Sequence, residues 1–147
     1  MVAIFGLLQW VLQFASASLC QFWHTIEGVP EKPVQARKLV WLVDSLDRLS
    51  RFPPVVRHTL GFALYQAQIG RTHESAKILR GFGETVWQVR ADDPSGTYRA
   101  VYMTQFRDAV YVLHAFQKKA PSGIATPRRE LDLIRERLHL VRKLAGK

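Results

Sequence analysis

Two stretches in the second half of the chain show the apolar pattern of β-strands. Residues 97–104 and 109–116 are rich in Val, Tyr and Phe, which are residue types enriched in strands. The four residues between them, 105–108, form a connection of a length that is common in hairpins. We therefore predict an antiparallel hairpin, around which the rest of the fold is organised.

The pairing within this hairpin decides which side chains share a face of the sheet. If Thr104 pairs with Ala109, Arg99 lies directly opposite His114. The same face is then predicted to carry four apolar side chains, Val101, Met103, Val110 and Val112. Because Arg keeps its charge and His titrates near neutral pH, the hairpin would place a fixed cation beside a group that can transfer protons.

The rest of the apolar pattern predicts two further strands and three helices. Residues 39–43 form a continuous apolar run, and residues 85–90 alternate between apolar and polar. One short helix is predicted from residue 44 or 45 to residue 50, and a longer one from Pro53-Pro54 to Gly70. A last helix follows Thr126-Pro127. The predicted fold class is α+β, with a small antiparallel sheet of about four strands, two N-terminal helices and one C-terminal helix.

The first 23 residues are apolar and uncharged, and they are long enough for a marginal membrane span. Gln and Ser side chains interrupt this segment, and no Lys or Arg flanks it. Three interpretations remain open: an extension outside the functional domain, a membrane-associating helix and a signal sequence. The Gly- and Pro-rich stretch 28–33 marks the predicted boundary. We expect residues 1–31 to be an apolar, helical N-terminal extension and residues 32–147 to form the functional domain.

Composition limits the class of protein further. A chain of 147 residues with 48% apolar residues can build one compact domain. Its formal net charge is +9, and all 21 Lys and Arg residues lie beyond position 31, which favours a polyanionic partner. The single cysteine, Cys20, cannot form an intrachain disulfide, which favours a reducing cytoplasm. No set of residues with metal-ligand spacing was found, so neither a metal nor a cofactor is predicted.

Several short motifs occur in an order that resembles a known family, the phage-derived HigB-like toxins of the RelE/ParE superfamily. The resemblance extends from about residue 32 to about residue 140. The motifs are Lys77-x-Leu79-x-Gly81-Phe82-Gly83, Gly96-Thr97-Tyr98-Arg99-x-x-Tyr102, the run from Tyr111 to Lys119, and Thr126-Pro127.

The resemblance implies the toxin of a type II toxin–antitoxin system. Such a toxin would be an mRNA interferase, an endoribonuclease that cuts mRNA on the ribosome, and a helix-turn-helix antitoxin of the HigA type would hold it inactive in the cytoplasm. In the relatives, a basic residue on one strand and the arginine of the Tyr-Arg motif bind the scissile phosphate. These residues match Arg90 and Arg99. Some relatives also have an arginine and a tyrosine near the C-terminus, whereas this chain has Lys118 and Lys119 and no tyrosine after Tyr111.

The chemistry of RNA cleavage assigns roles to the same residues. Metal-free cleavage uses the 2′-hydroxyl as the nucleophile, and the enzyme must stabilise a dianionic phosphorane and transfer protons. The planar donors of Arg90 and Arg99 suit the phosphorane, and His114 is the candidate acid or base. A lone histidine on a strand is also commonly structural. The remaining residues expected to bind RNA are Lys77, Arg80, Tyr98, Lys118 and Lys119.

Two other functions remain open at this stage. ParE-type relatives share the fold and inhibit DNA gyrase without cutting RNA. A third possibility is a non-catalytic protein that only binds its antitoxin and acts as a co-repressor. The predicted basic cluster with a titratable group favours RNA cleavage, because inhibition of a protein target requires no such cluster.

Overall fold

The computed structural model describes residues 35–106, 109–118 and 126–146. The predicted apolar extension and Lys119 lie outside the described residues. None of the helices in the described ranges is both long enough and apolar enough to span a bilayer.

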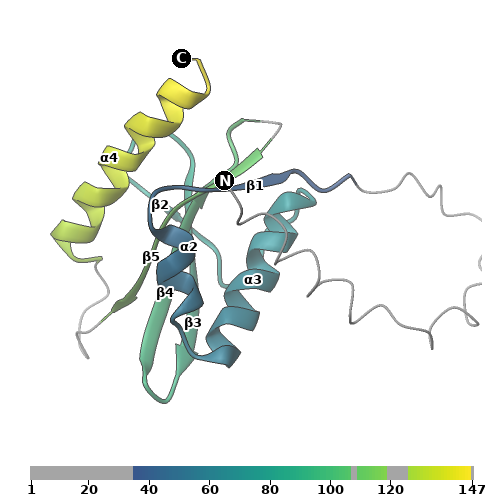
Figure 1. The fold of residues 1–147 in the computed structure, drawn as a ribbon, viewed down its shortest axis with the longest axis vertical. Coiled ribbons are helices and arrows are strands. Elements are labelled where there is room, and N and C mark those ends of the chain that lie inside the picture. Colours follow the sequence, from purple (N-terminus) through teal and green to yellow (C-terminus); the bar gives the residue numbers. More distant parts are fainter. Residues whose placement is uncertain (1–34, 107–108, 119–125, 147) are drawn as a thin grey trace, which may run out of the picture. The chain divides into compact units, whose positions relative to one another are not determined.

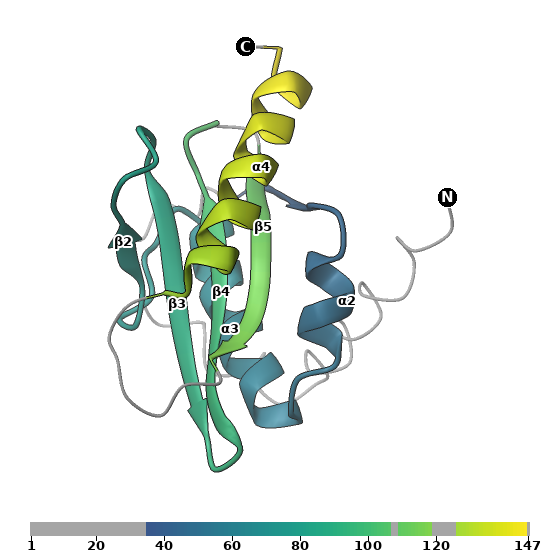
Figure 2. The same cartoon turned by 90° about the vertical axis from the view of Figure 1, so that its left-hand side faces the viewer.

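Five strands form one mixed sheet (Figures 1 and 2). They are β1 (Lys38–Trp41), β2 (Lys77–Leu79), β3 (Val86–Asp93), β4 (Gly96–Met103) and β5 (Ala109–Lys118), in the order β1-β5-β4-β3-β2. β1 runs parallel to β5, whereas the other neighbours are antiparallel. The predicted hairpin is therefore the centre of the sheet. Strand β2 was not predicted, because its three residues are too few to show an alternating pattern.

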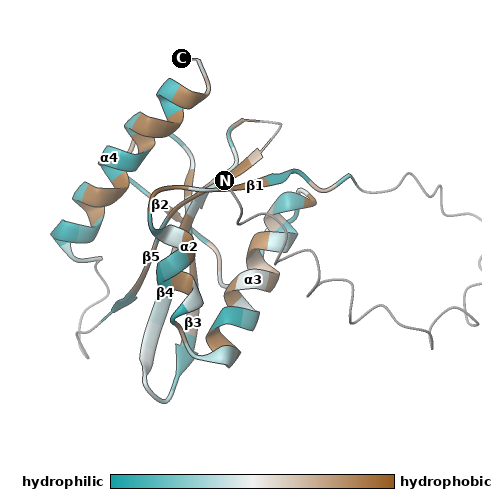
Figure 3. Cartoon of the chain, in the orientation of Figure 1, coloured by the Kyte–Doolittle hydropathy of each residue, from teal (hydrophilic) through white to brown (hydrophobic). Residues whose placement is uncertain are grey.

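Helices cover both faces of this sheet. The helices are α2 (Ser45–Ser50), α3 (Pro54–Gln68) and α4 (Arg128–Leu144), which confirms the predicted α+β class with two earlier helices and one C-terminal helix. α3 buries Val56, Leu60 and Leu64 against one face. α4 buries Ile134 and Val141 against the other. Apolar and polar residues alternate along α4, as expected for a helix with one buried side (Figure 3).

The hairpin pairs in a different register from the predicted one. Arg99 pairs with Phe116, and His114 pairs with Val101, so the predicted direct pairing of Arg99 with His114 is wrong. The ladder is irregular between Val101 and Tyr102, whose partners skip Leu113. An extra residue of this kind changes which side chains share a face. The face of the sheet under α3 therefore holds Val110 and Val112, whereas Arg99 and His114 lie on the face under α4.

Candidate functional site

Arg90 and Arg99 lie directly opposite each other on β3 and β4. The side chain of Arg90 is 56% exposed and forms an ion pair with Asp92 at 2.9 Å. Arg99 is only 7% exposed. The two arginines predicted to bind a phosphate are therefore neighbours on one face of the sheet, one at the surface and one beneath it.

Arg99 has few partners for a buried cation. Its Nη1 donates to Thr126 Oγ1 at 3.2 Å, and Thr126 in turn donates to Gln88 Oε1 at 3.1 Å. Arg99 Nε is buried, and the described residues offer it no hydrogen-bond acceptor. Burial lowers the pKa of Arg99, and the nearby charge of Arg90 lowers it further. Two neighbouring guanidinium groups with a spare donor are well suited to bind an anion such as a phosphate.

His114 is fully buried at the centre of a polar network beneath α4. Arg137 Nη1 donates to His114 Nδ1 at 2.9 Å, which leaves the proton of a neutral imidazole on Nε2. That nitrogen donates to Glu130 Oε2. Burial is the main cause that lowers the pKa of His114, so the neutral ring is favoured. An imidazole with no exposed surface and both nitrogens bonded has no free nitrogen to offer a substrate.

The network continues from Arg137 to α2. Arg137 is 5% exposed, donates to the backbone oxygen of Leu113 at 2.8 Å, and forms an ion pair with Asp44. Asp44 precedes α2 and also binds Arg48 of that helix. These hydrogen bonds and the pull of both arginines hold the pKa of Asp44 low, although burial acts in the opposite direction. The network therefore connects α4, β5 and the start of α2.

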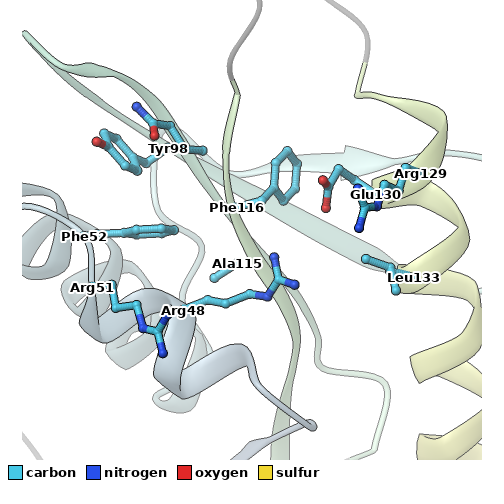
Figure 4. A pocket seen from close by; sticks show the side chains of 10 residues that line it. Arg48, Arg51, Phe52, Tyr98, Ala115, Phe116, Arg129, Glu130 and Leu133 are labelled. Carbon is cyan, nitrogen blue, oxygen red and sulfur yellow. The ribbon is translucent and has the colours of Figure 1, made fainter.

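A cavity of about 430 Å³ opens between α2 and α4 beside the second half of β5 (Figure 4). β1 pairs only with the first four residues of β5, so no described strand covers this part of the edge. Arg48 from α2 and Glu130 from α4 extend into the space over Ala115 and Phe116 (Figure 4). The full lining consists of Arg48, Arg51, Phe52, Tyr98, Ala115, Phe116, Gln117, Arg129, Glu130 and Leu133.

The predicted RNA-binding residues are not all in one place. Lys77 pairs with Gln88 and Lys118 pairs with Thr97, so each lies two residues along the strands from the Arg90–Arg99 row, on the same face. Arg80 is exposed just after β2.

Tyr98 packs with the apolar cluster under α3 and against Phe52, with ring centroids 4.8 Å apart. It therefore lines the cavity from the opposite face of the sheet from Arg99.

Four polar residues of the site were not predicted to belong to it. Thr126 was expected only to precede the last helix, but it also joins Arg99 to Gln88, while Pro127 is the N-cap of that helix. Gln88 could have been found, because strand alternation places it on the face of Arg90. Arg137 also left a signal, since it is a cation at helical spacing within the apolar stripe of α4. No sequence pattern identified Glu130.

Comparison with known proteins places the chain in a family. The model of the family described as Phage derived protein Gp49-like (DUF891) matches residues 47–139, which is more than half of the chain. No curated protein sequence matches the chain significantly. Among solved structures, the chain is similar to a double mutant of the E. coli toxin RelE in the free state, with 23% identity and a TM-score of 0.45, over 58% of this chain and 87% of that one. The match to the family model shows that the chain belongs to the Gp49-like family of phage-derived proteins, in agreement with the phage-derived family that its motifs predicted.

Proposed function

We propose that this protein is the toxin of a type II toxin–antitoxin system and that it cuts mRNA on the ribosome. One observation carries the proposal. Arg90 and Arg99 are direct cross-strand neighbours, and the buried member of the pair has a donor without an acceptor in the described residues. Such a pair destabilises the fold unless an anion binds to the two guanidinium groups. Family membership and the basic composition support RNA as the source of that anion.

In the proposed reaction the 2′-hydroxyl attacks the adjacent phosphate and expels the 5′-oxygen without a metal. Arg90 and Arg99 bind the phosphate and stabilise the phosphorane, on which negative charge accumulates. Lys77 and Lys118, each two residues along the strands from the arginine pair, hold the flanking phosphates. We assign His114 a positioning role, because a fully buried ring with both nitrogens bonded is kept away from the substrate.

The proposed partners follow from the same function. The toxin would act on mRNA in the ribosome, and a HigA-like helix-turn-helix antitoxin would inhibit it. Gyrase inhibition and a purely co-repressing role are the competing functions. Neither of them gives a reason to bury a cation such as Arg99 beside a second one.

The test compares the full-length protein with two variants on ribosomes loaded with a defined mRNA. Primer extension would locate cleavage. We expect Arg99→Ala to reduce the cleavage rate at least about 100-fold, as does the loss of one donor to a developing oxyanion in other enzymes. Arg57→Ala is the matched control, because Arg57 is exposed on α3, which covers the other face of the sheet. It should cleave like the parent protein.

Expression in bacteria separates the three functions. Immediate loss of protein synthesis with mRNA fragments supports the proposal. DNA breaks with intact mRNA would replace it by gyrase inhibition. Growth without any defect, with the antitoxin still bound, would leave only the co-repressor function. Equal cleavage by Arg99→Ala and the parent protein would refute the role of the arginine pair.

A further inference from the structure

Glu130 is the one carboxylate among the residues that line the cavity beside β5. Its side chain is 20% exposed, whereas His114, which donates to it, is fully buried. The exposed end of the buried network is therefore an acidic oxygen that faces the cavity. A network that only stabilised the packing of α4 would not need a carboxylate at the solvent-accessible cavity.

The network also fixes which nitrogen of His114 carries the proton. Arg137 cannot accept a hydrogen bond, so His114 Nδ1 must be the acceptor and Nε2 must carry the proton. His114 can then only donate to Glu130. Glu130 is therefore held as a hydrogen-bond acceptor with a fixed orientation, which is the state required of a general base.

The segment that carries Glu130 also contacts Arg99, through Thr126. Phe116 pairs with Arg99 across the β4–β5 ladder and stacks on His114, with ring centroids 5.4 Å apart. Thr126, which binds Arg99, precedes Glu130 by four residues at the start of α4. Figure 4 shows the Glu130 carboxylate beside the Phe116 ring. The same short segment thus connects Glu130 and Arg99 to one part of the sheet.

We propose that Glu130 is the general base that activates the 2′-hydroxyl of the RNA. This inference rests on the proposed function. The O–H bond of the 2′-hydroxyl breaks and its proton passes to Glu130, while the 2′-oxygen forms a bond to phosphorus. The bond from phosphorus to the 5′-oxygen breaks, and that oxygen takes a proton from water. The products are a 2′,3′-cyclic phosphate and a 5′-hydroxyl, and Glu130 returns its proton to water.

The charged groups around Glu130 come from three elements. His114 contacts it from β5, with Arg137 of α4 behind the ring. Arg129 of α4 and Arg48 of α2 line the same cavity. Protonation of the carboxylate would remove the base. We therefore expect the cleavage rate to decrease in acid.

The test measures single-turnover cleavage of ribosome-bound mRNA by the full-length protein across a pH series. Glu130→Gln keeps an oxygen that accepts the His114 proton, so the fold should persist. We expect its cleavage rate to be about 10²- to 10⁴-fold lower, the typical contribution of general acid–base catalysis. The affinity for the loaded ribosome should not change, and the acidic limb of the pH–rate profile should disappear. Glu136→Gln, at an exposed position of the same helix, should behave like the parent protein.

Glu130→Asp is the second variant, because it retains a carboxylate on a shorter side chain. It should keep the acidic limb at a reduced rate, and this comparison remains informative if the Gln variant fails to fold. Glu130→Gln that cleaves within about threefold of the parent protein, or that retains the acidic limb, would overturn the inference and leave the proposed function intact. A parent protein that cleaves no RNA would instead refute the proposed function, and the role of Glu130 with it.

Discussion

Arg90 and Arg99 are cross-strand partners in the β3–β4 ladder, and the second of them is buried. Like charges placed directly opposite each other destabilise a sheet, and a buried donor without a partner adds a further cost. Arg99 Nε is such a donor among the residues that the structure describes. Local destabilisation of this kind is common where a protein keeps a binding site at the expense of stability.

This relationship predicts that replacing Arg99 by an uncharged residue raises the stability of the protein and lowers its activity. Arg99→Met retains much of the buried volume but removes the charge and the unpartnered donor. We expect the free energy of unfolding to rise by about 0.5–1 kcal/mol, while cleavage is lost. Urea denaturation followed by circular dichroism measures the first effect. A loss of more than about 2 kcal/mol would mean that Arg99 stabilises the fold.

A second prediction concerns the strained connection between β1 and α2. Val43 has a φ of 53° and is 72% exposed. A β-branched residue rarely adopts this left-handed conformation, whereas glycine adopts it without steric cost. We expect Val43→Gly to stabilise the protein by about 1 kcal/mol, since strain of this kind costs about 1–3 kcal/mol and the added flexibility of the unfolded chain offsets part of the gain. Val55→Gly, at an exposed position within α3, should instead destabilise it.

The sequence predicted most of the fold because each long element has its own periodicity. The alternation along residues 85–90 agrees with β3, which has Gln88 and Arg90 on one face and Trp87 and Val89 on the other. The irregularity at Leu113 left no such signal, because each residue on either side of it fits a strand. The turn also pairs one residue away from the predicted register, since Met103 lies opposite Tyr111, and the irregularity adds a second residue. Together they place His114 opposite Val101 instead of Arg99.

The site was harder to predict because it depends on contacts between elements distant in the sequence. Arg99 and Thr126 are 27 residues apart, and Arg137 and Asp44 are 93 apart. Local patterns describe the face on which a side chain lies but not the element that packs against it. The sequence therefore predicted the neighbourhood of Arg90 and Arg99, while the enclosure of His114 required the packing of α4.

A third prediction addresses the connection between α4 and α2. Arg137→Met removes the ion pair with Asp44 and the hydrogen bonds to Leu113 and His114. Asp44 is partly exposed and keeps Arg48, so the cost should lie below that of a fully buried pair. We expect a loss of about 2–4 kcal/mol by urea denaturation. Arg128→Met is the control, because Arg128 is exposed at the first position of α4, where a cation opposes the helix dipole. It should change stability by less than about 0.5 kcal/mol, and an equal loss in both variants would argue against the connection.

The last prediction concerns the pH dependence of stability. Burial lowers the pKa of His114 from its ordinary value of 6.5, so the unfolded chain binds a proton there before the folded protein does. The stability associated with neutral His114 is therefore complete above about pH 7.5 and decreases as the pH falls through the ordinary pKa of histidine. The free energy of unfolding should therefore be lower at about pH 5.5 than at about pH 7.5. Asp44 and Asp92 have lowered pKa values and act only in stronger acid.

Urea denaturation at several pH values, with His114→Gln beside the parent protein, measures this effect. The Gln variant should be less stable at neutral pH but should lose less stability between about pH 7.5 and about pH 5.5, because it has no group at this position to titrate. His58→Gln removes an exposed histidine of α3 and should keep the pH dependence of the parent protein. If the His114 variant retained the full pH dependence, another group would have to be its source. The pKa of His114 would then be equal in the folded and the unfolded protein, and burial would not favour its neutral form.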